Sequence, residues 1–336
     1  MSETNSKKVF ESDNLLEISD LHVQYDTDDA EVYALNGLNL KVKRGAKLGL
    51  VGETGAGKTT LALSILRLLP NRVGKITKES IVYDGTDLLK EPESFMLGLR
   101  GAKISMIFQD PMTSLNPTHT VGEQILEVLN LHFKDISKEE KNKKVDEILT
   151  LVGIPPARKN EFPHQFSGGM KQRIVIAMAL VAEPELLLAD EPTTALDVTI
   201  QAQILELMRD LKEKYNSAVV LITHDLGVVA QFCESLAVVY GGRIVEYGTV
   251  EQIYARDKNH PYTSGLFDCI PDLTTKTARL TPIKGRMVDP RIKVQGCCFA
   301  DRCEHCMEIC RTKEPSVHEV DGHGILCHLF AEKEDI

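Results

Sequence analysis

The chain has 336 residues, of which 43% are hydrophobic and 26% are charged, values that are ordinary for a globular protein with one large domain or one domain plus a smaller part. Its formal net charge of −10 argues against nucleic acid as the main partner, because phosphate contacts need clustered Lys and Arg side chains. The most apolar stretch, residues 174–182, is too short for a membrane span, which needs about 20 residues.

The chain begins with a polar segment, residues 1–13, which has no apolar core. We expect it to be a disordered leader and not a secretory signal. This composition favours a cytosolic protein, for which any role at a membrane comes through a partner.

Strands and helices are predicted to alternate along most of the chain. Apolar strands are expected at 15–25, 34–43, 46–52, 184–190 and 218–225, and helices at 59–69, 172–182 and 199–215. Buried strands that alternate with helices predict an α/β fold with a mostly parallel sheet. Residues 110–165 are instead helical, rich in lysine and interrupted by proline, which indicates an inserted helical subdomain.

A glycine-rich loop between the third strand and the first helix matches the pattern G-x-x-x-x-G-K-[ST]. Its glycines let backbone N–H groups turn toward a phosphate chain, and the helix N-terminus adds partial positive charge. Lys58 supplies charge to the β- and γ-phosphates, and the Thr59 hydroxyl is a candidate ligand of Mg²⁺. The nucleotide-contacting residues predicted here are Gly52, Glu53, Thr54, Gly55, Ala56, Gly57, Lys58, Thr59 and Thr60.

Two adjacent carboxylates end the apolar strand at 184–190. Asp190 is placed to hold Mg²⁺ through water, and Glu191 to polarise an attacking water as general base. Acidic residues also end strands as solvated turns, so this pair gains its meaning from the phosphate loop. A Ser-Gly-Gly turn, residues 167–169, opens a helix and is a second candidate anion-binding element.

With these motifs the chain, from about residue 14 to 330, resembles the nucleotide-binding subunit of ABC transporters. The resemblance implies a P-loop NTPase core of the RecA type, with an antiparallel β subdomain, an inserted helical subdomain at about 110–170 and a small Cys-rich C-terminal appendage. The expected boundaries are 14–265 for the nucleotide-binding domain and 266–336 for the appendage.

The resemblance also implies roles for single residues. Glu191, His224 and Gln109 would act in catalysis, and Gln109 would join Thr59 and Asp190 around Mg²⁺. Tyr25 would stack on adenine. Two such subunits, identical or related, would hold ATP between the phosphate loop of one and the Ser167, Gly168 and Gly169 turn of the other.

Residues 108–117 (FQDPMTSLNP) and 259–266 (NHPYTSGL) further resemble ATPase subunits of oligopeptide and dipeptide importers, and nickel importers share these features. The expected function is therefore ATP hydrolysis that powers peptide import through two membrane permease subunits, served by an extracytoplasmic substrate-binding protein. The chain would sit peripherally on the cytoplasmic face of the membrane. Import of nickel or another small solute remains open, as does a soluble ABC-type ATPase without a transport role, on DNA or the ribosome.

Six of the eight cysteines lie between Cys297 and Cys327, and thiols so crowded in a reducing cytosol suggest a metal. Four match cysteines of the importer subfamily, some of whose members carry a [4Fe–4S] cluster there: Cys297, Cys303, Cys310 and Cys327. Zn²⁺ is the alternative, and a set of free thiols is the third interpretation. A further functional hypothesis, an iron–sulfur protein that uses ATP only for regulation, is supported by this segment alone. The roles of Cys298 and Cys306 stay open.

Overall fold

The computed structural model describes residues 13–194, 196–270 and 282–331. The predicted leader therefore lies outside the described residues, apart from Asp13. Within the described ranges, no helix combines the length and apolarity that a bilayer crossing requires.

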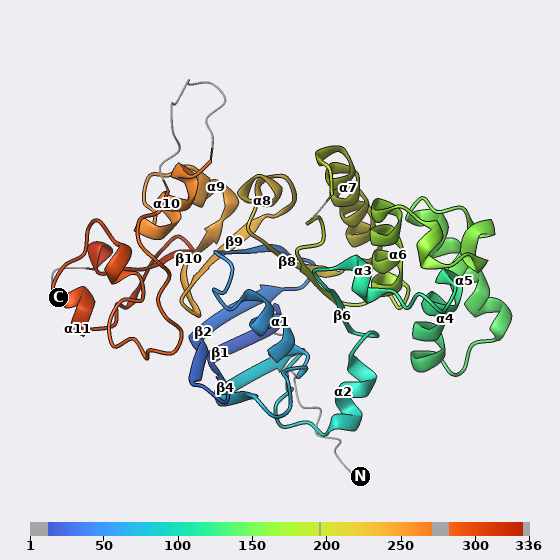
Figure 1. Cartoon of the computed structure of the whole chain (residues 1–336), viewed down its shortest axis with the longest axis horizontal. Helices are drawn as coiled ribbons and strands as arrows, with labels where there is room; N and C mark the ends of the chain where they lie inside the picture. The colour runs from blue at the N-terminus through green and yellow to red at the C-terminus, as the bar shows by residue number, and fades with distance from the viewer. Residues whose placement is uncertain (1–12, 195, 271–281, 332–336) are drawn as a thin grey trace, which may run out of the picture.

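An antiparallel sheet forms the N-terminal layer, with strand order β2-β1-β4-β5 (Figure 1). Its strands are β1 (Asn14–Asp26), β2 (Glu31–Lys43), β4 (Gly74–Tyr83) and β5 (Thr86–Asp87). The end of β2 alternates buried and exposed residues, as a strand with one covered face must. This sheet is the antiparallel β subdomain that was expected.

The second sheet has the order β11-β12-β10-β9-β3-β8-β7-β6, and the five strands from β9 to the edge strand β6 are parallel. They are β3 (Lys47–Val51), β6 (Ile104–Ile107), β7 (Leu186–Asp190), β8 (Ala218–Thr223) and β9 (Ser235–Tyr240). Every residue of β7 and β8 is buried, which explains why these strands are apolar without alternation. The prediction of an α/β core with a mostly parallel sheet is confirmed.

Both faces of this sheet are covered. Leu186 and Leu188 of β7 belong to one hydrophobic core, while Leu187 and Ala189 belong to the other. The helices that cover the faces include α1 (Lys58–Ile65), α2 (Glu93–Leu99), α6 (Gly168–Leu180), α7 (Val198–Tyr215) and α8 (Leu226–Phe232). The sheet is thus fixed on both sides, and the loops at the carboxyl ends of its strands are held in place.

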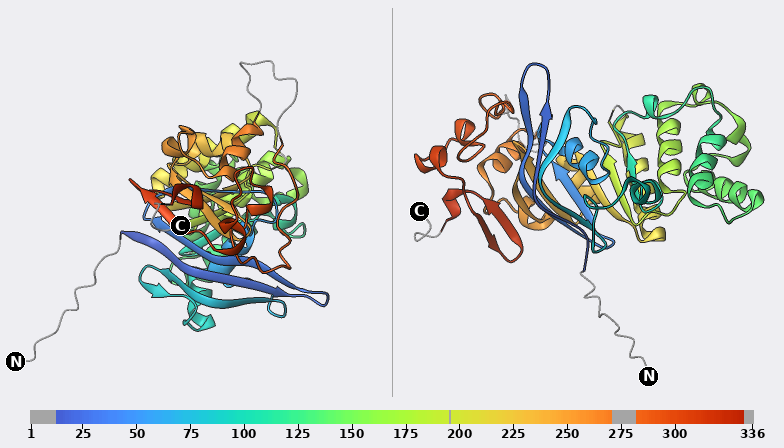
Figure 2. Two further views of the ribbon diagram at one scale, coloured as in Figure 1. Left: turned by 90° about the vertical axis from the view of Figure 1, so that its left-hand side faces the viewer. Right: turned by 90° about the horizontal axis from the view of Figure 1, so that it is seen from below.

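The segment between β6 and α6 is helical. It contains α3 (Pro111–Ser114), α4 (Val121–His132) and α5 (Lys138–Leu151), followed by two short 3₁₀ helices. Thr120 caps α4 and Ser137 caps α5, each with a glutamate three residues later that completes a capping box. These helices lie at the opposite end of the molecule from the C-terminal residues (Figures 1 and 2).

The C-terminal residues extend the main sheet. The strand β10 (Arg243–Thr249) pairs with β12 (His323–Leu326), which pairs in turn with β11 (Val317–Val320), all antiparallel. The helical pieces here are α9 (Val250–Tyr254), α10 (Pro261–Asp268), η3 (Ala300–Arg302), α11 (Ile309–Thr312) and η4 (His328–Phe330). The C-terminal strands β12 and β11 therefore continue the core sheet beyond β10.

Candidate ATP site

The phosphate loop, residues 52–59, connects β3 to α1. Gly55 and Gly57 have positive φ angles of 85° and 103°, which favour glycine. A Cβ atom at Gly57 would lie 2.7 Å from the carbonyl oxygen of Ala34, and one at Gly52 would lie 2.2 Å from that of Val239. The glycines are needed both for the turn and for close packing against neighbouring strands.

Lys58 is almost fully buried at the start of α1. Its ammonium group donates hydrogen bonds to the carbonyl oxygens of Gly52, at 2.6 Å, and Glu53, at 3.0 Å. Burial lowers the pKa of Lys58, against the opposing effect of nearby carboxylates, foremost that of Glu191. The side chain is therefore folded back over the loop, with its charge facing the position predicted for phosphates.

Thr59 and Asp190 meet from different elements. The Thr59 hydroxyl, in the first turn of α1, donates to Oδ2 of Asp190 at 2.7 Å. Asp190 ends β7 and is 2% exposed, and burial raises its pKa while the Thr59 hydrogen bond opposes that rise. Hydroxyl and carboxylate oxygens are the ligands that Mg²⁺ prefers, so this pair fits the predicted magnesium site.

Glu191 is held by three side chains. Oε2 accepts hydrogen bonds from Nε2 of Gln109, at 3.0 Å, and from the hydroxyl of Thr194, at 2.9 Å. Oε1 lies 3.0 Å from Nδ1 of His224. The residue has a φ of 47°, a strained angle that is common at functional sites. The structure thus brings together the three residues predicted for catalysis and adds Thr194, which sequence reasoning missed.

The electrostatic surroundings of Glu191 favour its ionised form. Burial by itself raises the pKa of the carboxyl group, but the hydrogen bonds from His224 and Thr194 and the nearby charge of Lys58 outweigh it. The net result is a pKa below the usual value. A carboxylate that stays charged can accept a proton at neutral pH.

These groups surround one cavity of about 430 Å³. The predicted residues that line it are Tyr25, Thr54, Gly55, Gly57, Lys58, Thr59, Thr60, Gln109, Asp190, Glu191 and His224. Val32, Ala34 and Pro290 complete the lining and were not predicted. The Tyr25 and Thr60 hydroxyls lie 3.1 Å apart, which holds the tyrosine against α1. Gly52, Glu53 and Ala56 shape the loop without lining the cavity.

The Ser-Gly-Gly turn stands apart from this cavity. None of Ser167, Gly168 and Gly169 lines it, and the first two are exposed at the start of α6. A Cβ atom at Gly168 would meet nothing within 4 Å, whereas one at Gly169 would lie 2.8 Å from a methyl carbon of Ile200. The turn is therefore packed against α7 on one side and open on the other.

The four predicted ligand cysteines gather in the C-terminal part. The Cys297 amide donates to the Cys310 carbonyl at 2.8 Å. Burial, and then the neighbouring thiols, raise the pKa of Cys297 to about 11 and that of Cys327 to about 12. However, among the described residues no three His, Cys, Asp or Glu side chains are arranged to hold a metal ion. The predicted [4Fe–4S] cluster is therefore not supported by the arrangement of these side chains.

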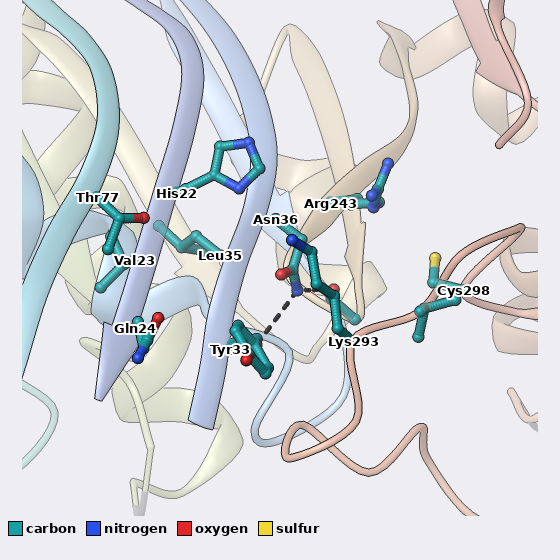
Figure 3. Close-up of a pocket in the computed structure, with 12 residues that line it drawn as sticks. His22, Val23, Gln24, Tyr33, Leu35, Asn36, Thr77, Arg243, Lys293 and Cys298 are labelled. Atoms are coloured by element: carbon teal, nitrogen blue, oxygen red, sulfur yellow. Dashed lines mark hydrogen bonds between the residues drawn. The ribbon is translucent and has the colours of Figure 1, made fainter. Parts of the chain in front are cut away.

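Cys298, which is not one of the four predicted ligand cysteines, has separate surroundings. It borders a separate cavity of about 130 Å³ between β1, β2 and the segment at 293–298 (Figure 3). Its thiol donates to the Tyr240 carbonyl oxygen at 3.6 Å, and burial raises its pKa to about 12. Asn36 crosses the same cavity and donates to the carbonyl oxygens of Tyr33 and Gly241. Cys298 is thus a buried packing residue. The other cysteine outside the group of four, Cys306, donates from its thiol to the carbonyl oxygen of Met307.

Comparison with known proteins identifies the family. A family model described as "ABC transporter" matches residues 35–194, and one described as "Oligopeptide/dipeptide transporter, C-terminal region" matches 245–310. The oligopeptide transport ATP-binding protein OppD of Bacillus subtilis is 50% identical over 320 residues, which cover 94% of this chain and 89% of that one. This chain belongs to the ABC transporter family. The dipeptide transport ATP-binding protein DppD of the same organism is 47% identical, over 96% of this chain and 97% of its own length.

Solved structures of this ABC family share the fold. The ATP-binding cassette MJ0796, as a dimer in a post-hydrolysis state with ADP and phosphate, has a TM-score of 0.63 at 29% identity, over 70% of this chain and 98% of its own. The cassette cbiO1 of Clostridium perfringens, part of the transporter complex cbiONQ, has a TM-score of 0.64 at 28% identity, over 73% and 92%. The expected P-loop NTPase core is confirmed.

Proposed function

We propose that this chain is the ATP-binding and ATP-hydrolysing subunit that powers import of oligopeptides or dipeptides through a partner membrane permease. The observation that carries the proposal is the cavity in which the Glu191 carboxylate, held by Gln109 and His224, accompanies the Thr59–Asp190 pair. The relatives named for oligopeptide and dipeptide transport align along nearly the whole chain, which supports peptides as the cargo.

The chemistry follows from the positions of these groups. Lys58 binds the β- and γ-phosphates, and the backbone N–H groups of the loop bind the oxygens between them. Glu191 accepts a proton from the attacking water while the water oxygen forms a bond to the γ-phosphorus. The bond between that phosphorus and the oxygen that bridges it to the β-phosphate breaks. Thr59 and Asp190, with Gln109 nearby, would hold Mg²⁺, which would supply positive charge to the phosphate oxygens. His224 and Thr194 keep the Glu191 carboxylate oriented toward the water.

A second ATPase subunit, identical or related, completes the site. The support for this is that Ser167 and Gly168 are exposed at a helix N-terminus and absent from the cavity of their own chain. A helix N-terminus attracts phosphate oxygens. The turn of one subunit would therefore close the ATP cavity of the other.

The assembly would also contain two permease subunits and an extracytoplasmic substrate-binding protein, with this chain on the cytoplasmic face of the membrane. Gln109 links the ATP cavity to the helical segment 111–165, and the neighbouring Phe108 is 45% exposed. The segment belongs to the proposed nucleotide-binding domain at 14–265. Its link to the ATP cavity and its exposed neighbour support it as the surface that contacts a permease subunit.

Purification of the intact complex from its native membrane, followed by ATP-driven uptake in vesicles, tests the proposal. We expect two permease subunits to copurify and labelled peptides to accumulate only with ATP. Uptake of nickel, with no uptake of peptide, would replace peptide by nickel as the assigned cargo. A chain that purifies with no membrane protein, or copurifies with DNA or ribosomes, would contradict the transport function itself.

We also propose that Cys297, Cys303, Cys310 and Cys327 hold a [4Fe–4S] cluster, with Zn²⁺ as the alternative. The support is the donor set: four cysteines lie near one another, and Cys310 and Cys327 are buried. Burial, and then the repulsion of neighbouring thiols, raises the pKa of Cys297 to about 11 and that of Cys327 to about 12. A bound cation would offset both effects. Because these side chains do not already form a coordination group, loading would require them to reorient.

A further inference from the structure

An arginine of the C-terminal appendage contacts the phosphate loop. Arg302, the last residue of η3, donates from Nη1 to Oε2 of Glu53 at 2.6 Å and from Nη2 to Oε1 at 3.1 Å. Glu53 is the second residue of the loop and lies 249 positions earlier in the sequence. Two parallel hydrogen bonds between a guanidinium and a carboxylate are strong and directional.

Arg302 is itself fixed by its surroundings. Its side chain is 5% exposed, against 29% for Glu53. Nε donates to the Lys284 carbonyl at 3.0 Å, and Nη2 to that of Ile283 at 3.4 Å. The guanidinium also lies 5.6 Å from the ring centre of Tyr240. Because Arg302 is already held, it loses little further side-chain entropy when it pairs with Glu53. Exposed ion pairs do lose that entropy, and they contribute almost nothing to stability.

The backbone of Glu53 is held from the same side. Its amide N–H donates to the hydroxyl of Tyr262, at 2.9 Å, in α10. Tyr262 is completely buried and packs against Tyr240, with ring centres 4.6 Å apart, and against Phe299 at 5.4 Å. One aromatic cluster, Tyr240, Tyr262 and Phe299, thus supports both Glu53 and its partner Arg302.

The position of Glu53 matters for the phosphates. Its carbonyl oxygen accepts a hydrogen bond from Lys58, so a shift of this peptide displaces the ammonium group. Its carboxylate also introduces negative charge into a loop that must receive a triphosphate. Arg302 compensates that charge at hydrogen-bond distance, where the local dielectric is low.

We propose that Arg302 is a positioning residue for ATP, which holds and neutralises Glu53 so that the phosphate loop keeps its binding conformation. The Cys-rich appendage is then a structural part of the nucleotide site and not a separate attachment. This inference rests on the proposed binding of ATP in the cavity beside the loop.

The test is a double-mutant cycle on the full chain. ATP dissociation constants with Mg²⁺ are measured for wild type, Arg302→Met, Glu53→Gln and the double variant. Arg302→Met leaves the Glu53 carboxylate of the phosphate loop without its arginine partner, so ATP should bind roughly tenfold more weakly. The double variant should regain most of that loss, because it has no such charge. Arg302→Lys should bind better than Arg302→Met.

Arg311→Met is the matched control, because Arg311 lies in the same appendage in an exposed pair with Asp301. We expect it to bind ATP like wild type. The inference is contradicted if Arg302→Met binds like wild type, or if the double variant is as weak as Arg302→Met, since a general loss of structure would give the latter result. A wild-type chain that binds no ATP would instead overturn the proposed function.

Discussion

Nδ1 of His224 lies 3.0 Å from Oε1 of Glu191, although the two residues follow different strands. The contact forms because β7 and β8 are parallel neighbours, which places the residues after their carboxyl ends side by side. The interaction helps to keep the pKa of Glu191 below its usual value, against the effect of burial. This relationship gives a pH-dependent prediction.

The pH dependence of ATP hydrolysis should reflect the ionisation of Glu191. A general base works only when it is deprotonated, and a lowered pKa keeps it deprotonated to lower pH. The rate should therefore fall only below the usual carboxyl range. In His224→Ala the pKa of Glu191 rises, so the acid limb of the kcat profile should move to higher pH, and kcat should fall on the order of 100-fold. An acid limb that does not move would contradict the pairing.

The Thr59–Asp190 pair predicts a magnesium phenotype. Thr59→Val removes the hydroxyl that contacts Asp190, so half-maximal hydrolysis should require roughly tenfold more Mg²⁺. Thr59→Ser keeps the hydroxyl and serves as the matched control. Titration of Mg²⁺ at saturating ATP measures the effect. Equal requirements in the valine and serine variants would remove Thr59 from the metal site.

Gln109 links the Glu191 carboxylate to the helical segment proposed to contact a permease subunit. Gln109→Ala should therefore reduce peptide transport and its stimulation of ATP hydrolysis more than it reduces ATP affinity. Reconstituted complexes allow all three quantities to be measured on one preparation. If cargo stimulates hydrolysis equally in wild type and variant, Gln109 has no coupling role.

Much of the site was predictable because it consists of local patterns. The loop at 52–59 and the carboxylates after β7 are read from consecutive residues, and parallel strands bring their ends together. Thr194 was missed although it lies only three residues after Glu191, because a threonine in a turn is an ordinary residue. Contacts from the distant C-terminal part left no local signal. Pro290 lines the cavity and its carbonyl accepts from the Tyr33 amide at 2.7 Å, but only the fold places them together.

The cysteines illustrate the opposite case. Their clustering in sequence was evident, and the fold does gather Cys297, Cys303, Cys310 and Cys327. Ligand geometry depends on side-chain orientation, which residue spacing does not determine. The sequence placed Cys298 outside the group of four but left its role open, and only the fold shows that it is buried against the Tyr240 carbonyl.

Metal analysis tests the proposed cluster. After anaerobic purification we expect about four irons and four sulfides per chain. Cys303→Ser should lose the metal, whereas Cys298→Ser, outside the group of four, should retain it. One zinc per chain would favour the alternative ligand. Wild-type protein with neither metal would leave these thiols as packing residues.

The central claim, that Glu191 is the base of an ATPase, is tested most directly by Glu191→Gln. The amide keeps the shape of the side chain but cannot accept the proton. Steady-state hydrolysis by the assembled transporter and ATP binding are measured together. We predict that ATP binding is retained while turnover falls by a factor on the order of 10² to 10⁴, with a closed ATP-bound dimer accumulating. Near-normal turnover in Glu191→Gln would contradict the claim.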